Sequence, residues 1–189
     1  MAGAATLQAS LDAAAAGQGT ISGGWDVWTP NGGYLAALVY GAMAAASRFN
    51  RPAAVYCQFL KPARHGPYDI VAEVVRSGTT SEVLRATLSQ DGRAVVLATA
   101  TLVADDMEGL QHRDHQAPQV PAPETLKPYE ALTEDFATWP IYWRQVEGRP
   151  CRWPEEQSAG TPAWRTWLRL RGGRIAGSPV RGGPDPPVE

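Results

Sequence analysis

The sequence predicts an α+β fold in which a curled antiparallel sheet wraps around one long central helix. Residues 31–47 contain no charged side chain, and a helix that is apolar on all sides is expected to be buried. Four runs of β-branched and other apolar residues follow, and tight-turn signals separate the last three of them. A long buried helix followed by an antiparallel meander is expected to pack as one helical layer on one sheet layer.

The central helix is expected within the stretch that begins at residue 30, and it should end near residues 48–50, just before Pro52. Asn31 is a favoured N-cap residue, and Gly32 and Gly33 leave the backbone at the helix start open to close approach. Uncovered N–H groups at such a start can receive a developing negative charge. On local sequence alone, the favoured interpretation is that the glycines only let the helix pack tightly against the sheet, because a glycine pair is a weak signal of a binding site.

Five strands are expected around this helix. The first covers residues 20–28, where Gly23-Gly24 predicts a bulge or bend, and the others are the runs at 54–60, 68–76, 80–90 and 93–103. In the run at 80–90, apolar residues alternate with polar ones, as in a strand that is buried on one face. Asp91-Gly92 is a strong two-residue hairpin signal, and residues 4–16 could add a short helix before the sheet.

The composition changes after residue 104, which predicts four segments. Residues 1–104 form the first domain, and the proline- and charge-rich stretch at 105–131 is expected to be a linker. Residues 132–171 are rich in aromatic side chains, and strands are expected at 136–146 and 163–171, as the beginning of a second, incomplete domain. Glycine, proline and arginine dominate residues 172–189, which predicts a disordered tail.

Composition and charge narrow the class of protein. A formal net charge of −2 argues against a dedicated nucleic-acid binder. The uncharged stretch is too short and too rich in alanine for a membrane span, and no secretory signal is recognisable. Two cysteines are too few for a disulfide framework, so a cytoplasmic protein is expected. His112 and His115 have a metal-like spacing without further ligands, so neither a metal nor a cofactor is expected.

Six short motifs occur in a characteristic order: NGGYL at 31–35, QFLKP at 58–62, VVRSG at 74–78, SEVLR at 81–85, QDG at 90–92 and ATA at 98–100. Their order and spacing resemble the hotdog-fold acyl-CoA thioesterases, in particular the first half of the thioesterase II-like, double-hotdog branch. The resemblance covers residues 20–104, and residues 136–171 resemble the start of the second hotdog. It implies a complete first hotdog followed by a truncated second one.

The resemblance implies hydrolysis of acyl-CoA thioesters to free acid and CoA. Such a reaction needs donors for the developing oxyanion and a base or a group that positions water. Thr80 matches a position where the family places a hydroxyl, so it could orient a water, although an ordinary strand threonine is an equally good interpretation. The residues that the resemblance implies for substrate binding are Asn31, Gly32, Gly33, Tyr34 and Ser81.

The sequence departs from the family in its acidic residues. In double-hotdog enzymes the catalytic Asp, hydroxyl and Gln lie largely in the second hotdog, and the central helix of this chain carries no carboxylate. Asp26 and Glu73 are the nearest acids by sequence, and Asp26 is the candidate base. Whether the shortened chain is active is therefore left open.

Three functions are weighed on this basis. The first is an acyl-CoA thioesterase, and the second is a non-catalytic module that binds acyl thioesters or pairs with another chain. The third, a hotdog hydratase, is disfavoured because it needs an Asp/His pair near the helix, whereas the three histidines lie elsewhere in the sequence. Exposed sheet edges predict a homodimer or a higher homo-oligomer.

Overall fold

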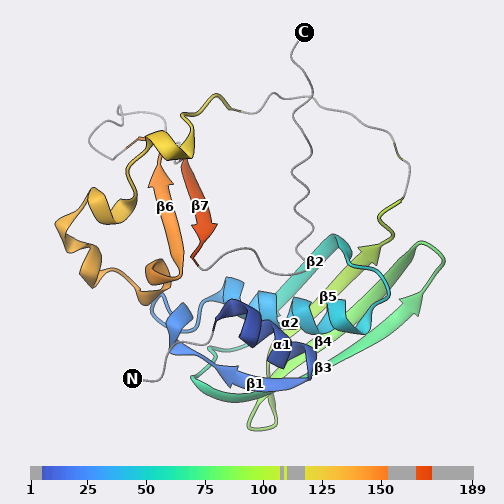
Figure 1. Cartoon of the computed structure of the whole chain (residues 1–189). Helices are drawn as coiled ribbons and strands as arrows, with labels where there is room; N and C mark the ends of the chain where they lie inside the picture. Colours follow the sequence, from blue (N-terminus) through green and yellow to red (C-terminus); the bar gives the residue numbers. More distant parts are fainter. Residues whose placement is uncertain (1–5, 107–108, 110–117, 153–164, 172–189) are drawn as a thin grey trace.

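The computed structural model describes residues 6–106, 109, 118–152 and 165–171 (Figure 1). A five-stranded antiparallel sheet with the order β1-β3-β4-β5-β2 carries helices on one face. The predicted α+β hotdog architecture is therefore confirmed. The strands are β1 Gln18–Ile21, β2 Arg51–Phe59, β3 Gly66–Ser77, β4 Ser81–Gln90 and β5 Arg93–Val103.

The central helix α2 spans Gly32–Ala46 and confirms the predicted helix. Its buried residues recur at helical spacing along the side that faces the sheet: Tyr34, Leu35, Leu38, Val39, Ala42 and Met43. A second helix, α1 (Leu7–Ala15), packs along α2, and a Cβ on Gly41 would lie 3.2 Å from the Leu11 side chain. Because the sheet and α1 both cover α2, a charge on either flank would be buried without water.

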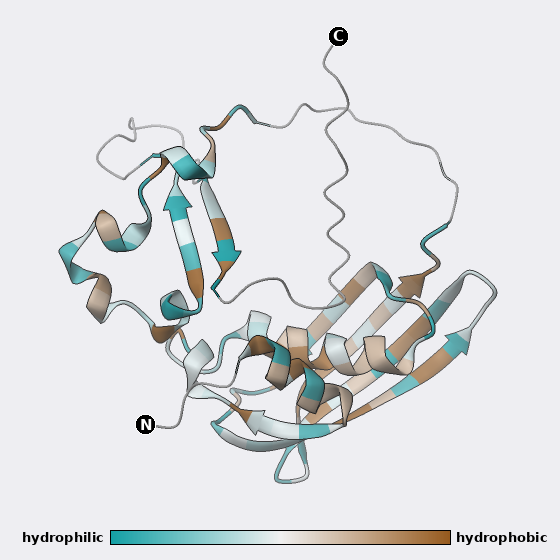
Figure 2. Ribbon diagram, viewed as in Figure 1, coloured by the Kyte–Doolittle hydropathy of each residue, from teal (hydrophilic) through white to brown (hydrophobic). Residues whose placement is uncertain are grey.

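Strands β3, β4 and β5 form the sheet surface on which α2 packs. The predicted alternation in β4 is confirmed, because Leu84, Ala86 and Leu88 are buried. Asp91 and Gly92 have φ values of 50° and 70°, the left-handed conformation that a tight two-residue hairpin needs at both positions. Figure 2 shows hydrophobic residues on the helices and on the strands that they cover. Among the described helices, none combines the length and the hydrophobicity that a membrane crossing needs.

The structure differs from two of the predicted strands. The segment at 20–28 is a strand only in its first part, and the segment at 136–146 is not a strand. Over 20–28, β1 ends at Ile21, and the 3-10 helix η1 (Gly23–Trp25) follows, because the Ser22 hydroxyl accepts from the Gly24 N–H at 3.2 Å. Over 136–146, the prediction of a strand is wrong. This segment forms the 3-10 helices η4 (Glu134–Thr138) and η5 (Ile141–Arg144), whose aromatic rings pack on one another instead of alternating between two faces.

The C-terminal module is a two-stranded sheet with short helical turns packed beside it. Strand β6 (Val146–Pro150) pairs with β7 (Thr166–Leu170), and η2 (Pro123–Thr125) and η3 (Tyr129–Ala131) precede them. Glu147 is almost fully buried and accepts from Arg149 at 2.6 Å and from Arg169 at 2.8 Å. The domain boundaries at 104, 131 and 171 stay predictions, and the tail at 172–189 lies outside the described residues.

The module contacts the first domain next to the start of α2. The Tyr142 N–H donates to the Asp26 carbonyl at 3.0 Å, and the rings of Tyr142 and Trp25 meet edge to face at 6.4 Å. Val146 is buried in the same core cluster as the residues of α2. The segment between η1 and α2 is therefore contacted by the C-terminal module as well as by the first domain.

A buried carboxylate fixes the opposite end of α2. Glu82 accepts from the Ser47 hydroxyl at 2.7 Å, the Arg48 N–H at 3.1 Å and the Ser77 hydroxyl at 2.8 Å. The Arg48 guanidinium also lies 3.2 Å from this carboxylate. The two hydroxyls, followed by the Arg48 backbone and charge, hold the pKa of Glu82 below its ordinary value.

We predict that Glu82→Gln lowers the unfolding temperature at neutral pH. Since the pKa of Glu82 is lowered by folding, its stabilising effect is full above the ordinary carboxyl pKa of roughly 4.3 and is lost as the pH falls through the folded value. The gap between the unfolding temperatures of wild type and Glu82→Gln should therefore narrow on acidification. Thermal unfolding over a pH series measures it, and a gap that stays constant with pH would refute the role of the Glu82 charge.

Candidate functional site

The structure places the residues implied for substrate and catalysis at two different ends of α2. Asn31 and the two glycines form the N-terminal end, whereas Thr80 and Ser81 lie in and after the β3–β4 turn. This turn sits at the C-terminal end of α2, where the Arg48 side chain donates to the Gly78 carbonyl. At about 1.5 Å per residue, the 15 residues of α2 separate the two groups by roughly 22 Å. Within one chain, these groups do not meet.

Asn31 caps α2, as its residue type predicts. Its side-chain oxygen accepts from the N–H groups of Gly33 at 2.7 Å and Tyr34 at 3.3 Å. Two of the amides expected to hold an oxyanion are therefore occupied by this cap, whereas the Gly32 N–H has no such acceptor among the described residues. A Cβ on Gly32 would lie 3.3 Å from the Phe59 ring, so this position needs a glycine for the close approach of that ring.

The Tyr34 side chain belongs to the core. Its ring stacks on Trp25 at 5.6 Å with planes 8° apart, and its hydroxyl donates to Ser10 at 3.2 Å. Tyr34 therefore positions the Trp25 segment beneath the site and does not present its side chain to a ligand at the surface.

Asp26 pairs with a histidine beside the start of α2. His65 Nε2 lies 2.7 Å from Asp26 Oδ2, which is hydrogen-bond distance. His65 belongs to the connection between β2 and β3, and a Cβ on Gly23 would lie 3.4 Å from the imidazole. Because Asp26 forms a β-bridge with Pro30, this pair is linked through a short loop directly to the helix start.

The backbone around Asp26 is held at several points. Its N–H donates to Gly23, its carbonyl accepts from Tyr142, and the Asn31 N–H donates to the Trp25 carbonyl at 3.3 Å. One carboxylate oxygen, Oδ1, is buried and has no partner within the described part of the chain. A fixed carboxylate that orients an imidazole is the arrangement that general-base catalysis uses. The side chain of His65 is 56% exposed, so water can reach the imidazole.

The expectation that the histidines lie away from the helix is wrong for His65. Asp26 and His65 are 39 residues apart in sequence, and the pairing of β1 with β3 brings them together. In this pairing Ile21 lies opposite Gly66, so the residues that follow β1 meet the residues that precede β3. His112 and His115 lie outside the described residues.

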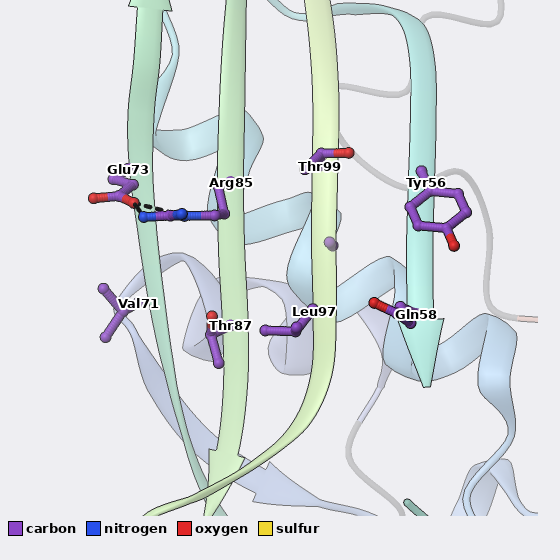
Figure 3. A pocket seen from close by; sticks show the side chains of 9 residues that line it. Tyr56, Gln58, Val71, Glu73, Arg85, Thr87, Leu97 and Thr99 are labelled. Carbon is purple, nitrogen blue, oxygen red and sulfur yellow. Dashed lines mark hydrogen bonds and ion pairs between the residues drawn. The ribbon is translucent and has the colours of Figure 1, made fainter. Parts of the chain in front are cut away.

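A hollow on the outer face of the sheet holds the other candidate acid, Glu73. Two cross-strand rows line this open hollow of about 440 Å³ (Figure 3). Glu73 accepts from the Arg85 Nε at 2.8 Å, and the dashed lines in Figure 3 mark this pairing. The hollow therefore offers a neutralised ion pair in place of a free base. The rows are Glu73, Arg85, Thr99 and Tyr56, and Val71, Thr87, Leu97 and Gln58.

Potential metal ligands are not grouped in the described ranges. Within residues 6–106, 109, 118–152 and 165–171, no three His, Cys, Asp or Glu side chains gather in a way that could hold a metal ion. The functional groups near the start of α2 are the Asp26 carboxylate, the His65 imidazole and the Gly32 backbone amide.

Comparison with known proteins finds a family model that resembles the first part of the chain. Residues 21–103 match the family model of the acyl-CoA thioesterase N-terminal domain. No curated protein matches the chain. This match covers 83 of the 189 residues, and it confirms the resemblance that the sequence motifs indicated.

Solved structures share the hotdog fold. A hot-dog-fold protein of unknown function from Alicyclobacillus acidocaldarius is 23% identical with a TM-score of 0.72, over 86% of this chain and 62% of that one. A candidate thioesterase II from Thermobifida fusca YX is 20% identical with a TM-score of 0.68, over 81% of this chain and 57% of that one. The acyl-CoA thioesterase II TesB2 from Mycobacterium marinum is 18% identical with a TM-score of 0.57, over 76% of this chain and 52% of that one. The chain thus spans between half and two thirds of their length.

We predict that Asn31→Ala destabilises the protein by about 1 kcal/mol, because the mutation removes the N-cap of α2. Asn31→Ser, which retains a capping oxygen, should cost much less. Urea unfolding of wild type and both variants measures the free energies of unfolding. Equal losses for Ala and Ser would show that the Asn31 side chain acts otherwise than as a cap.

Proposed function

We propose that the protein hydrolyses acyl-CoA thioesters to the free acid and CoA, and that the reaction takes place at the start of α2. The observation that carries this proposal is the Asp26–His65 pair, with its 2.7 Å contact. It lies beside the helix start in the part of the chain that matches the acyl-CoA thioesterase N-terminal domain model. A general base near an uncovered helix amide is what thioester hydrolysis requires.

The proposed reaction assigns one task to each group. The imidazole of His65 takes a proton from water through the nitrogen that does not face Asp26, and the water oxygen attacks the acyl carbon. Asp26 stabilises the resulting imidazolium, and the Gly32 N–H donates to the oxyanion. The carbon–sulfur bond then breaks, and the proton passes from His65 to the sulfur of CoA.

Thr80 and Ser81 have no task in this reaction within one chain, because they lie at the far end of α2. They could orient a water or contact substrate at this site only if a second copy supplied them. Asn31 also limits the site, since its side chain holds two of the three amides at the helix start. This cap favours the alternative function, a module that binds acyl thioesters without hydrolysing them.

We predict that the purified chain releases free thiol from acyl-CoAs, and that Asp26→Asn and His65→Gln each lower the rate by about 10²- to 10⁴-fold, as loss of a general base does. Glu73→Gln is the matched control, because Glu73 lies on the outer face in its pair with Arg85. Thiol titration with a panel of acyl-CoAs measures the rates.

The same assay distinguishes the alternatives. Equal rates for wild type and His65→Gln would refute the proposed base. Binding of acyl-CoA without thiol release would favour the binding module. Addition of water to an enoyl-CoA, with loss in both variants, would favour a hydratase, the function that the Asp26–His65 pair makes worth testing.

We also propose that the chain forms a homodimer or a higher homo-oligomer through the edge of β2 that no described strand covers. This strand ends the sheet, and residues 52–59 carry no charge. Val55 and Tyr56 are exposed large hydrophobic residues on it. Natural edge strands are usually protected by charges or by a covering element, so pairing with a second copy would complete this edge.

We predict that the wild type sediments as a dimer or larger species at tens of micromolar, and that Val55→Lys shifts it to monomer. Lysine on an edge strand opposes strand pairing. Val71→Lys on β3, away from the edge, is the control and should leave the association unchanged. A wild-type monomer throughout this concentration range would refute self-association.

For the cellular compartment we retain the cytoplasm as a proposal. Cys57 and Cys151 are both unbridged, and free thiols persist most readily where the surroundings are reducing. Fractionation of cells that produce the protein tests this assignment.

A further inference from the structure

Trp28 stands out among the exposed hydrophobic residues, with 92% of its surface accessible. It lies at the tip of the loop between Asp26 and Pro30, which form a β-bridge with each other. The Val27 N–H donates to the Thr29 carbonyl at 3.2 Å, which tightens the loop further. The loop therefore presents a large apolar side chain to solvent from a backbone that is well held.

Two further exposed hydrophobic residues lie against the same stretch of chain. Phe59, at the end of β2, is 50% exposed, and its ring lies next to Gly32. Ile141, in η5, is 38% exposed, and the N–H of the following Tyr142 donates to the Asp26 carbonyl. Trp28, Phe59 and Ile141 thus come from three separate segments. Trp28 belongs to residues 26–32, the Phe59 ring contacts this stretch at Gly32, and Ile141 directly precedes the residue whose N–H binds it. We call these three side chains the apolar rim.

We propose that the apolar rim binds the aliphatic chain of the acyl thioester. An acyl thioester combines a polar carbonyl with an apolar tail, and the start of α2 combines a hydrogen-bonding centre with an uncharged rim. The carbonyl would lie between the Gly32 amide and His65, and the tail would cover Trp28 and Phe59. This inference rests on the proposed function and extends it to the part of the substrate that the site recognises.

A small aliphatic ligand fits this rim better than a protein surface. The rim adjoins the Asp26–His65 pair, whose imidazole is 56% exposed. A protein that covered the rim would also remove the Asp26 carboxylate and the imidazole from water, and burial of such polar groups is costly. An acyl chain can bury the apolar side chains and leave the imidazole hydrated.

The test is the affinity of S-alkyl-CoA thioethers of increasing chain length, measured by calorimetry with the full chain. Since burial of one methylene contributes about 0.8 kcal/mol, the affinity should rise about fourfold for each added methylene that the rim buries. Trp28→Ala should reduce this gain in affinity per added methylene. Trp167→Ala is the control, because Trp167 is also exposed but lies on β7.

The outcomes separate this inference from the proposed function, because thioethers cannot be hydrolysed. A wild-type affinity that is independent of chain length, or a length dependence that Trp28→Ala leaves intact, overturns the apolar rim even if thiol release is observed. A length dependence that Trp28→Ala reduces supports the rim even if acyl-CoAs are not hydrolysed. If Trp28→Ala instead abolishes self-association and leaves the thioether series unchanged, a second copy covers the rim and the inference is wrong.

Discussion

The structure depends on the burial of α2, a helix without charged residues. Such a helix is stable in water only when other elements cover it. The curved sheet covers one side and α1 another. The small residues of α2 matter here, because Gly41 lets α1 approach closely. The fold is thus a cover built around one apolar helix, and only the two ends of this helix are available for polar chemistry.

The two ends of α2 have different chemistry. Glu82 closes the C-terminal end, where a carboxylate opposes the helix dipole, and the donors from Ser47, Arg48 and Ser77 compensate for this cost. The N-terminal end attracts negative charge and carries Asp26, His65 and the Gly32 amide. A reaction that develops an oxyanion is therefore favoured at the N-terminal end. Asn31 competes with such an oxyanion, because the same amides stabilise the helix through its side chain.

Local patterns were sufficient to predict most of the first domain. The uncharged stretch predicted α2, the alternation of apolar residues predicted β4, and Asp91-Gly92 predicted the hairpin that follows β4. Each of these features depends on residues that are close together in sequence. The prediction of a strand at 136–146 was wrong, because closely spaced aromatic residues can pack on each other in 3-10 turns as well as across a strand.

The candidate site was harder to predict, since it depends on contacts between distant residues. Asp26 was recognised only as an acid close in sequence, and His65 was missed because only the β1–β3 register brings it to Asp26. Thr80 and Ser81 were associated with the helix start by resemblance. The direction in which the β3–β4 hairpin runs along α2 places them at its other end, and no local pattern reveals that direction.

The most direct test of this account is a crystal structure of the protein with a non-hydrolysable ketone analogue of an acyl-CoA. The account predicts that the ketone oxygen lies within hydrogen-bond distance of the Gly32 N–H, with a water between the ketone carbon and His65. A ligand bound in the hollow on the outer face of the sheet, or anywhere away from the start of α2, would contradict it.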